Sequence, residues 1–200
     1  MLPRDTFLAV TAALIWGATF PLSAWALAET PPLTFTFLRF LCAAAFAVVI
    51  PKPDLPWSRL ILLGCLLGIG QYGLMFLAMS QGLPAGMAAV LVHTQAIFTV
   101  LLAMALLNER PGRRILTTLA LAGAGLLCLL IDRAQAGALI GFVLVIAAAL
   151  SAASGNIVLK SAGPVDMTRV AVWMSFAPLL PLLILSLIFE SHGSPAHLFA

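Results

Sequence analysis

The chain has 200 residues, of which 62% are hydrophobic and only 8% are charged. Soluble domains average about 45–50% apolar and about 25% charged residues, so this composition excludes an ordinary soluble protein and is typical of a membrane protein. The net charge is +3, but the basic residues are scattered over short loops and form no solvated patch with aromatic residues. Nucleic-acid binding is therefore not expected.

Seven apolar segments of about 20 residues follow one another along the chain. A helix of that length crosses a hydrocarbon core of roughly 30 Å, so the sequence predicts an all-α integral membrane protein, a bundle of seven transmembrane helices. Short loops join neighbouring helices in antiparallel fashion and leave no room for a soluble domain. The predicted spans are 6–27, 32–50, 58–80, 84–107, 114–131, 138–159 and 168–189.

The basic residues of the loops predict the orientation of the bundle. Lys and Arg accumulate on the cytoplasmic side of a membrane. Eight of them flank the spans on one side, and Arg133 lies alone on the other. This predicts a cytoplasmic amino terminus and an outward-facing segment after the last span. Cleavage of the first span as a signal peptide would leave the same alternation, so charge alone does not exclude it. The eight residues are Arg4, Lys52, Arg59, Arg110, Arg113, Arg114, Lys160 and Arg169.

Polar side chains lie near the middle of several spans, at similar predicted depths. An unpartnered polar group in hydrocarbon is costly, so such residues face another helix or a wet cavity. We expect a shared midplane cavity; the alternative is hydrogen bonding between helices, worth only about 0.6 kcal/mol on average. His93 and Gln95 lie about 200° apart on a helix and cannot both face one point. The candidate substrate-binding residues are Trp16, Thr19, Arg39, Gln71, His93, Gln95 and Asn156.

Arg39 is the only fixed charge in the interior of a predicted span, since Arg59, Arg114 and Arg169 lie within the first two residues of theirs. It lies about 10 Å from the outer end of that span, at 1.5 Å per residue, and a cation there costs at least ~2.5 kcal/mol on insertion scales. Every Asp and Glu lies at a helix end or in a loop, so no carboxylate within a span can pair with it. An anionic ligand group is one candidate partner, and the alternatives are snorkelling toward water and helix carbonyl groups.

Other motifs predict helix packing and not chemistry. Gly64 and Gly68 have the small-xxx-small spacing that allows close helix contact. The three cysteines fall singly in three spans and are expected to be small packing residues, with no metal site among them. Pro21, Pro178 and Pro181 are expected to kink the first and last spans and to free carbonyl groups there.

Four stretches carry a resemblance to a known family: "ALIWGATFPLSAWAL" in the first span, "PPLTFTFLRFLCAA" in the second, "GIGQYGLMFLAMSQGLPAGMAAVLVHTQAIFTVLLAMALLNERP" across the third and fourth, and "GFVLVIAAALSAASGNIVLK" in the sixth. With these stretches the chain resembles the EamA family of the drug/metabolite transporter superfamily. It is especially similar to bacterial exporters of O-acetylserine and cysteine.

The resemblance implies ten helices in two inverted five-helix repeats around a central cavity, and efflux of small metabolites across the bacterial inner membrane. Residues 1–133 would form the first repeat, and residues 134–200, with two helices, the start of an incomplete second repeat. Trp16, Gln71 and Gln95 match polar or aromatic positions of the exporters, and the "GN" at Asn156 matches the sixth span. The implied partners are a small metabolite and the lipid bilayer, and no cofactor is expected.

These features favour an exporter of small amino-acid-like metabolites that works by alternating access through a midplane cavity. An enzyme would need paired carboxylates, a His/Asp ligand cluster or an activated nucleophile at membrane depth, and none is visible in the sequence. The other alternative is a truncated, non-transporting membrane protein with a structural or assembly role. The oligomeric state stays open, a homodimer included.

His93 is the candidate for proton coupling. Proton-driven transporters pass protons through buried Asp, Glu or His side chains, and His93 is the only residue within the seven spans that could titrate near neutral pH. We therefore expect it to line or border the translocation route and to give efflux a pH dependence. The alternatives are a neutral His93 that hydrogen-bonds a neighbouring helix, coupling in other helices, and uncoupled export.

Overall fold

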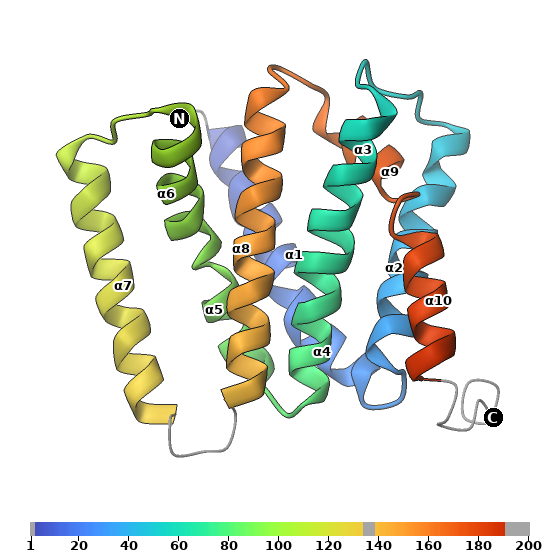
Figure 1. Cartoon of the computed structure of the whole chain (residues 1–200), viewed down its shortest axis with the longest axis horizontal. Helices are drawn as coiled ribbons and strands as arrows, with labels where there is room; N and C mark the ends of the chain where they lie inside the picture. The colour runs from blue at the N-terminus through green and yellow to red at the C-terminus, as the bar shows by residue number, and fades with distance from the viewer. Residues whose placement is uncertain (1–2, 134–138, 191–200) are drawn as a thin grey trace.

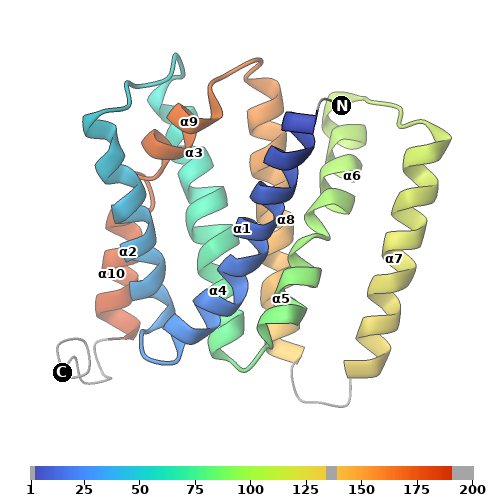
Figure 2. The same ribbon diagram turned by 180° about the vertical axis from the view of Figure 1, so that it is seen from behind.

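The computed structural model describes the backbone of residues 3–133 and 139–190 and the side chains of residues 5–126 and 139–190. All regular elements in these residues are helices, as predicted. Figures 1 and 2 show them standing roughly antiparallel in a bundle, with α1 crossing one face obliquely. The helices are α1 (Pro3–Leu27), α2 (Pro32–Ala45), α3 (Trp57–Leu63), α4 (Leu74–Ser80), α5 (Ala85–Val92), α6 (Gln95–Leu107), α7 (Arg113–Arg133), α8 (Leu139–Ser161), α9 (Met167–Met174) and α10 (Leu179–Phe189).

Two further elements lengthen these helices into longer rods. A 3₁₀ turn, η1 (Phe46–Val48), continues α2, and a π-helical segment, η2 (Gly64–Gly73), joins α3 to α4. A π-helix is rare and is mostly a single-turn bulge inside an α-helix, so ten residues of it are unusual. The sequence gives no sign of this segment apart from its four glycines.

Four helical rods in the described residues are long and apolar enough to cross a membrane: Asp5–Leu27, Trp57–Ser80, Ala85–Leu107 and Leu139–Ser161. A fifth is added if α9 and α10 count as one span bent by 41°. The segment Pro32–Val48 is a shorter apolar helix, and α7 is helical over the predicted fifth span. The all-helical membrane fold is confirmed, whereas the count of seven spans and the repeat arrangement remain predictions.

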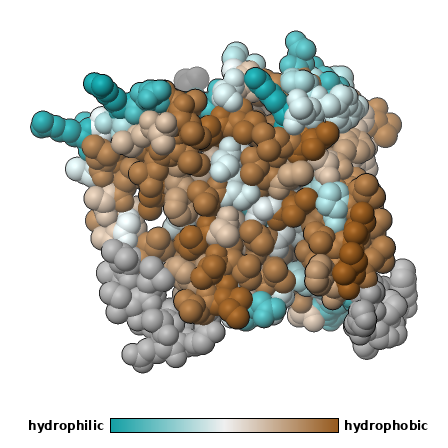
Figure 3. Space-filling view, viewed as in Figure 1, coloured by the Kyte–Doolittle hydropathy of each residue, from teal (hydrophilic) through white to brown (hydrophobic). Residues whose placement is uncertain are grey.

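The outside of the bundle is apolar, as a lipid-facing surface requires. Large hydrophobic side chains are widely exposed, among them Trp25 at 76% and Phe189 at 71%. Figure 3 shows hydrophobic residues covering the middle of one face, with most hydrophilic residues along its upper edge. Soluble monomers seldom expose apolar patches larger than a few hundred Å², so this surface fits immersion in a bilayer.

Helix α8 occupies the centre of the bundle and packs against η2, α4, α5 and α6. Its inner face consists mostly of glycine and alanine, and such small residues let neighbouring helix backbones approach closely. The Ser151 hydroxyl donates a hydrogen bond to the carbonyl of Leu66 in η2 at 2.8 Å. The fully buried small residues of this face are Ala148, Ala149, Ala152 and Ala153.

The glycines of η2 lie against the break between α9 and α10. A Cβ on Gly64 would collide with the Met174 carbonyl oxygen, and one on Gly68 would lie 2.7 Å from Pro178 Cγ. The predicted close packing at both glycines is confirmed. Of the expected proline effects, the last span is interrupted at Pro178, whereas α1 is a single helix across Pro21.

Candidate functional site

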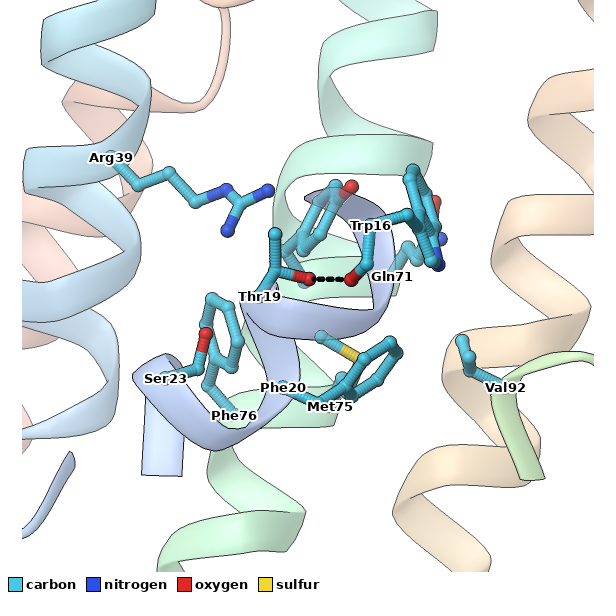
Figure 4. A pocket seen from close by; sticks show the side chains of 10 residues that line it. Trp16, Thr19, Phe20, Ser23, Arg39, Gln71, Met75, Phe76 and Val92 are labelled. Carbon is cyan, nitrogen blue, oxygen red and sulfur yellow. Dashed lines mark hydrogen bonds between the residues drawn. The ribbon is translucent and has the colours of Figure 1, made fainter. Parts of the chain in front are cut away.

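A small pocket lies where α1, α2, η2, α4 and α5 meet (Figure 4). Its cavity volume is about 10 Å³, which is room for about one water molecule. Four of the seven candidate residues line it, so the structure brings together polar groups from three predicted spans. The ten lining residues are Trp16, Thr19, Phe20, Ser23, Arg39, Gln71, Tyr72, Met75, Phe76 and Val92.

Helix α1 contributes one wall of the pocket through a single face. Trp16, Thr19, Phe20 and Ser23 follow the i, i+3, i+4, i+7 spacing of one helix side, and all four line the pocket. Among the described side chains of α1, only Phe20 and Ser23 are buried. The Thr19 hydroxyl donates to the Trp16 carbonyl at 2.6 Å, a hydrogen bond within α1.

Gln71 projects from the π-helical segment η2 and is 6% exposed. Its side-chain amide has no hydrogen-bond partner among the described residues, and the nitrogen and oxygen of that amide are not fully buried. The amide group can donate two hydrogen bonds and accept two. Gln71 is thus an almost fully buried residue whose amide has all of this capacity unused among the described residues.

Arg39 extends from α2 toward the α1 wall, as Figure 4 shows. Its guanidinium carbon lies 4.5 Å from the centroid of the Tyr72 ring and 5.9 Å from that of Phe76. Within the part of the chain that the structure describes, it has no ion pair and no hydrogen bond. The cation–π contacts reduce the cost of a charge at membrane depth, and its N–H donors stay free.

The other three candidates lie outside the pocket. Helix α5 ends at Val92, a turn at His93 and Thr94 follows, and α6 begins at Gln95. The His93 side chain is exposed and that of Gln95 is half-buried, and neither lines the pocket. The buried Thr94 hydroxyl donates to the Leu91 carbonyl at 2.7 Å, which satisfies a carbonyl at the helix break.

Asn156 makes a contact between helices. Its Nδ2 donates to Thr99 Oγ1 at 3.3 Å, which joins α8 to α6. Thr99 in turn donates to the Gln95 carbonyl at 2.7 Å. This is the interhelical hydrogen bonding that the sequence left as the alternative to cavity lining.

Sequence reasoning did not select two polar pocket residues, Ser23 and Tyr72. Ser23 lies four residues after Thr19 on the same helix face, so helical spacing from Trp16 and Thr19 would have found it. Tyr72 adjoins Gln71, and its role as the ring beneath Arg39 depends on packing between α2 and η2. No spacing rule along one helix predicts that contact.

The pocket combines one charged group with neutral polar and aromatic side chains. It is lined by one cation, several neutral hydrogen-bonding groups and aromatic rings, and no Asp or Glu is among its lining residues. In residues 3–133 and 139–190, no group of three or more His, Cys, Asp or Glu side chains could hold a metal ion.

Three curated proteins illustrate what the chain is similar to. It is 37% identical over 196 residues to a Salmonella typhimurium protein named "Probable amino-acid metabolite efflux pump", covering 94% of this chain and 65% of that protein. An Escherichia coli protein of the same name is 33% identical over 202 residues, with 97% and 67% covered. The uncharacterized transporter YvbV of Bacillus subtilis is 30% identical over 182 residues, with 86% and 57% covered.

The chain thus spans about two thirds or less of the length of these three relatives. No solved structure matches it. The model of the EamA-like transporter family matches residues 5–131, which is more than half of the chain. Together with the apolar helices, this match identifies a multi-pass membrane protein of a transporter class and not an enzyme. The chain belongs to the EamA-like transporter family.

Proposed function

We propose that the protein exports small amino-acid-like metabolites, of the O-acetylserine and cysteine type, by alternating access through the pocket of Figure 4. The observation that carries this proposal is Gln71. The residue is 6% exposed and lines the pocket, and its side-chain amide has no partner among the described residues. An unpaired amide at membrane depth is costly, and a polar solute that passes through the pocket would satisfy it.

The names of two relatives support the substrate class. Both the Salmonella and the Escherichia coli proteins are named as probable amino-acid metabolite efflux pumps. The pocket suits such solutes because it combines neutral hydrogen-bonding groups, at Thr19, Ser23 and Gln71, with the Arg39 cation and largely aromatic or apolar walls. Both names describe efflux, which is the direction proposed here.

Alternating access requires the pocket to widen, because about 10 Å³ holds no metabolite. We assign the moving wall to α1. Only Phe20 and Ser23 among its described side chains are buried, and both line the pocket. A displacement of α1 would therefore open the pocket while breaking few other buried contacts.

Efflux from loaded cells tests the proposal. Cells that express the chain, and cells with an empty vector, are loaded with radiolabelled cysteine or O-acetylserine, and release is followed over time. We expect faster release from the expressing cells at matched internal concentration. Release at the vector rate, with the protein demonstrably in the membrane, would contradict export and favour the structural or assembly role.

A further inference from the structure

We propose that Arg39 selects solutes that carry a free carboxylate, and that Tyr72 positions its guanidinium for this task. The inference rests on the proposed function, because it assigns the chemistry of recognition within the same pocket. Arg39 lines the pocket beside Trp16, Thr19 and Gln71. Among the described residues, no group accepts a hydrogen bond from its N–H donors.

Aromatic rings stabilise the positive charge of Arg39, but its N–H donors have no acceptor among the described residues. Its contacts with the rings of Tyr72, at 4.5 Å, and Phe76, at 5.9 Å, engage the positive charge. They use none of the five N–H donors, and no described residue accepts a hydrogen bond from them. A guanidinium presents these donors as a planar fork that matches the two oxygens of a carboxylate.

The charge of the pocket favours a group with a single negative charge. Arg39 is the one cation among the ten lining residues, and none of the ten is acidic. A carboxylate would neutralise Arg39, whereas a doubly charged phosphate would keep an uncompensated charge at membrane depth. A solute whose only charge is positive would be repelled by Arg39, and no acidic side chain lines the pocket to offset this repulsion.

Tyr72 is suited to hold the guanidinium because its own ring is fixed on two sides. Its centroid lies 5.9 Å from that of Phe40 and 5.9 Å from that of Phe76. Phe76 is fully buried and packs edge-on against Phe35 at 4.9 Å. A charged group held by a rigid aromatic cluster loses little freedom on binding, which is the condition for selective recognition.

A matched pair of ligands tests this assignment. The full chain is purified in detergent, and equilibrium dialysis measures the binding of cysteine and of cysteinamide, in which a neutral amide replaces the carboxylate. We expect wild type to bind cysteine about 10- to 100-fold more tightly, as a hydrogen-bonded charge pair implies. Arg39→Gln should reduce this ratio to near one, mainly through weaker cysteine binding. Arg59→Gln, which alters an exposed arginine outside the pocket, should keep the wild-type ratio.

Tyr72 variants supply a second test that does not depend on the folding of Arg39→Gln. Tyr72→Phe keeps the ring and should preserve the cysteine to cysteinamide ratio, whereas Tyr72→Leu removes the ring and should lower it. A simple packing role would weaken the binding of both ligands equally and leave the ratio unchanged.

The outcomes separate this inference from the proposed function. A carboxylate preference that disappears in Arg39→Gln supports the assignment even if the cells show no efflux, in which case export alone is wrong. If wild type shows equal affinity for both ligands, or binds neither, the assignment is overturned. It is equally overturned if Arg39→Gln keeps the wild-type ratio. Efflux of cysteine and cysteinamide at equal rates would leave export standing without selection by Arg39.

Discussion

Glu190, directly after α10, holds Thr34 in the first turn of α2. The Glu190 carboxylate accepts a hydrogen bond from the Thr34 backbone N–H at 2.9 Å and another from the Thr34 hydroxyl at 2.8 Å. It also accepts the Leu33 N–H at 2.6 Å. The first N–H groups of a helix lack partners within the helix, and its amino end favours negative charge. Glu190 therefore caps α2 from a residue more than 150 positions away in the sequence.

Loss of this cap should destabilise the bundle. We expect Glu190→Gln to lower the free energy of unfolding by about 1–2 kcal/mol, the usual cost of losing a charged helix cap. Thermal unfolding of the detergent-purified protein measures the effect. Glu29→Gln is the matched control, because Glu29 is exposed in the turn before α2 and its carboxylate has no partner among the described residues. Equal shifts in the two variants would show that the cap does not stabilise the fold.

Gly64 should tolerate no larger side chain. In Gly64→Ala, the new Cβ would collide with the Met174 carbonyl and lie 2.6 Å from Ala177 Cβ. Overpacking of this kind costs about 1–3 kcal/mol, which outweighs the helix propensity gained by alanine, at most about 1 kcal/mol. Gly86→Ala has open space around its Cβ and should be neutral or stabilising. The amount of folded protein recovered from membranes and its thermal stability are measured for both variants. A Gly64→Ala protein as stable as Gly86→Ala would refute the close contact.

The orientation can be tested at the two ends of the rod Trp57–Ser80. Ser58 and Gln81 are both exposed, and the loop charges predict that Ser58 is cytoplasmic and Gln81 is outside. With the native cysteines replaced, Gln81→Cys should react with a membrane-impermeant thiol reagent in intact cells. Ser58→Cys should react only after the cells are opened. The reverse labelling pattern would invert the topology.

Much of the helical framework could be predicted from the sequence. The predicted spans 58–80 and 84–107 coincide with the rods Trp57–Ser80 and Ala85–Leu107 within one residue at each end. A helix that crosses a bilayer must be apolar over the thickness of the hydrocarbon core, so such a helix can be recognised from the sequence alone. The irregular segments inside these rods could not be predicted, because the π-helical η2 and the turn at His93 depend on packing against other helices.

The site was predictable to the same limited degree. Depth along a span follows from residue counting, and on that basis Trp16, Arg39 and Gln71 were selected and do meet in one pocket. The rotation of each helix about its axis is set by its neighbours, which explains why His93 and Asn156, at comparable depth, lie outside that pocket. The cation–π contact of Arg39 with Tyr72 needs two helices in register, and no pattern in either helix encodes it.

The pH profile of efflux tests the predicted proton role of His93. The residue lies outside the pocket, next in sequence to the pocket-lining Val92, and its exposed side chain has no hydrogen bond to a described residue. His93→Gln keeps hydrogen-bonding capacity but removes titration, so we expect it to flatten the dependence of efflux on pH between about 5.5 and 8. An unchanged rate and profile in the mutant would show that His93 carries no protons.

The most direct test of the account compares Gln71→Leu with Gln95→Leu in the cysteine efflux assay. Both changes replace an amide with apolar bulk that a bilayer tolerates, but only Gln71 lines the pocket. At equal membrane abundance, we expect Gln71→Leu to reduce efflux by about ten-fold or more, as the loss of a buried hydrogen-bonding partner implies, while Gln95→Leu stays close to wild type. Wild-type efflux in Gln71→Leu would contradict the claim that this pocket is the route of the solute.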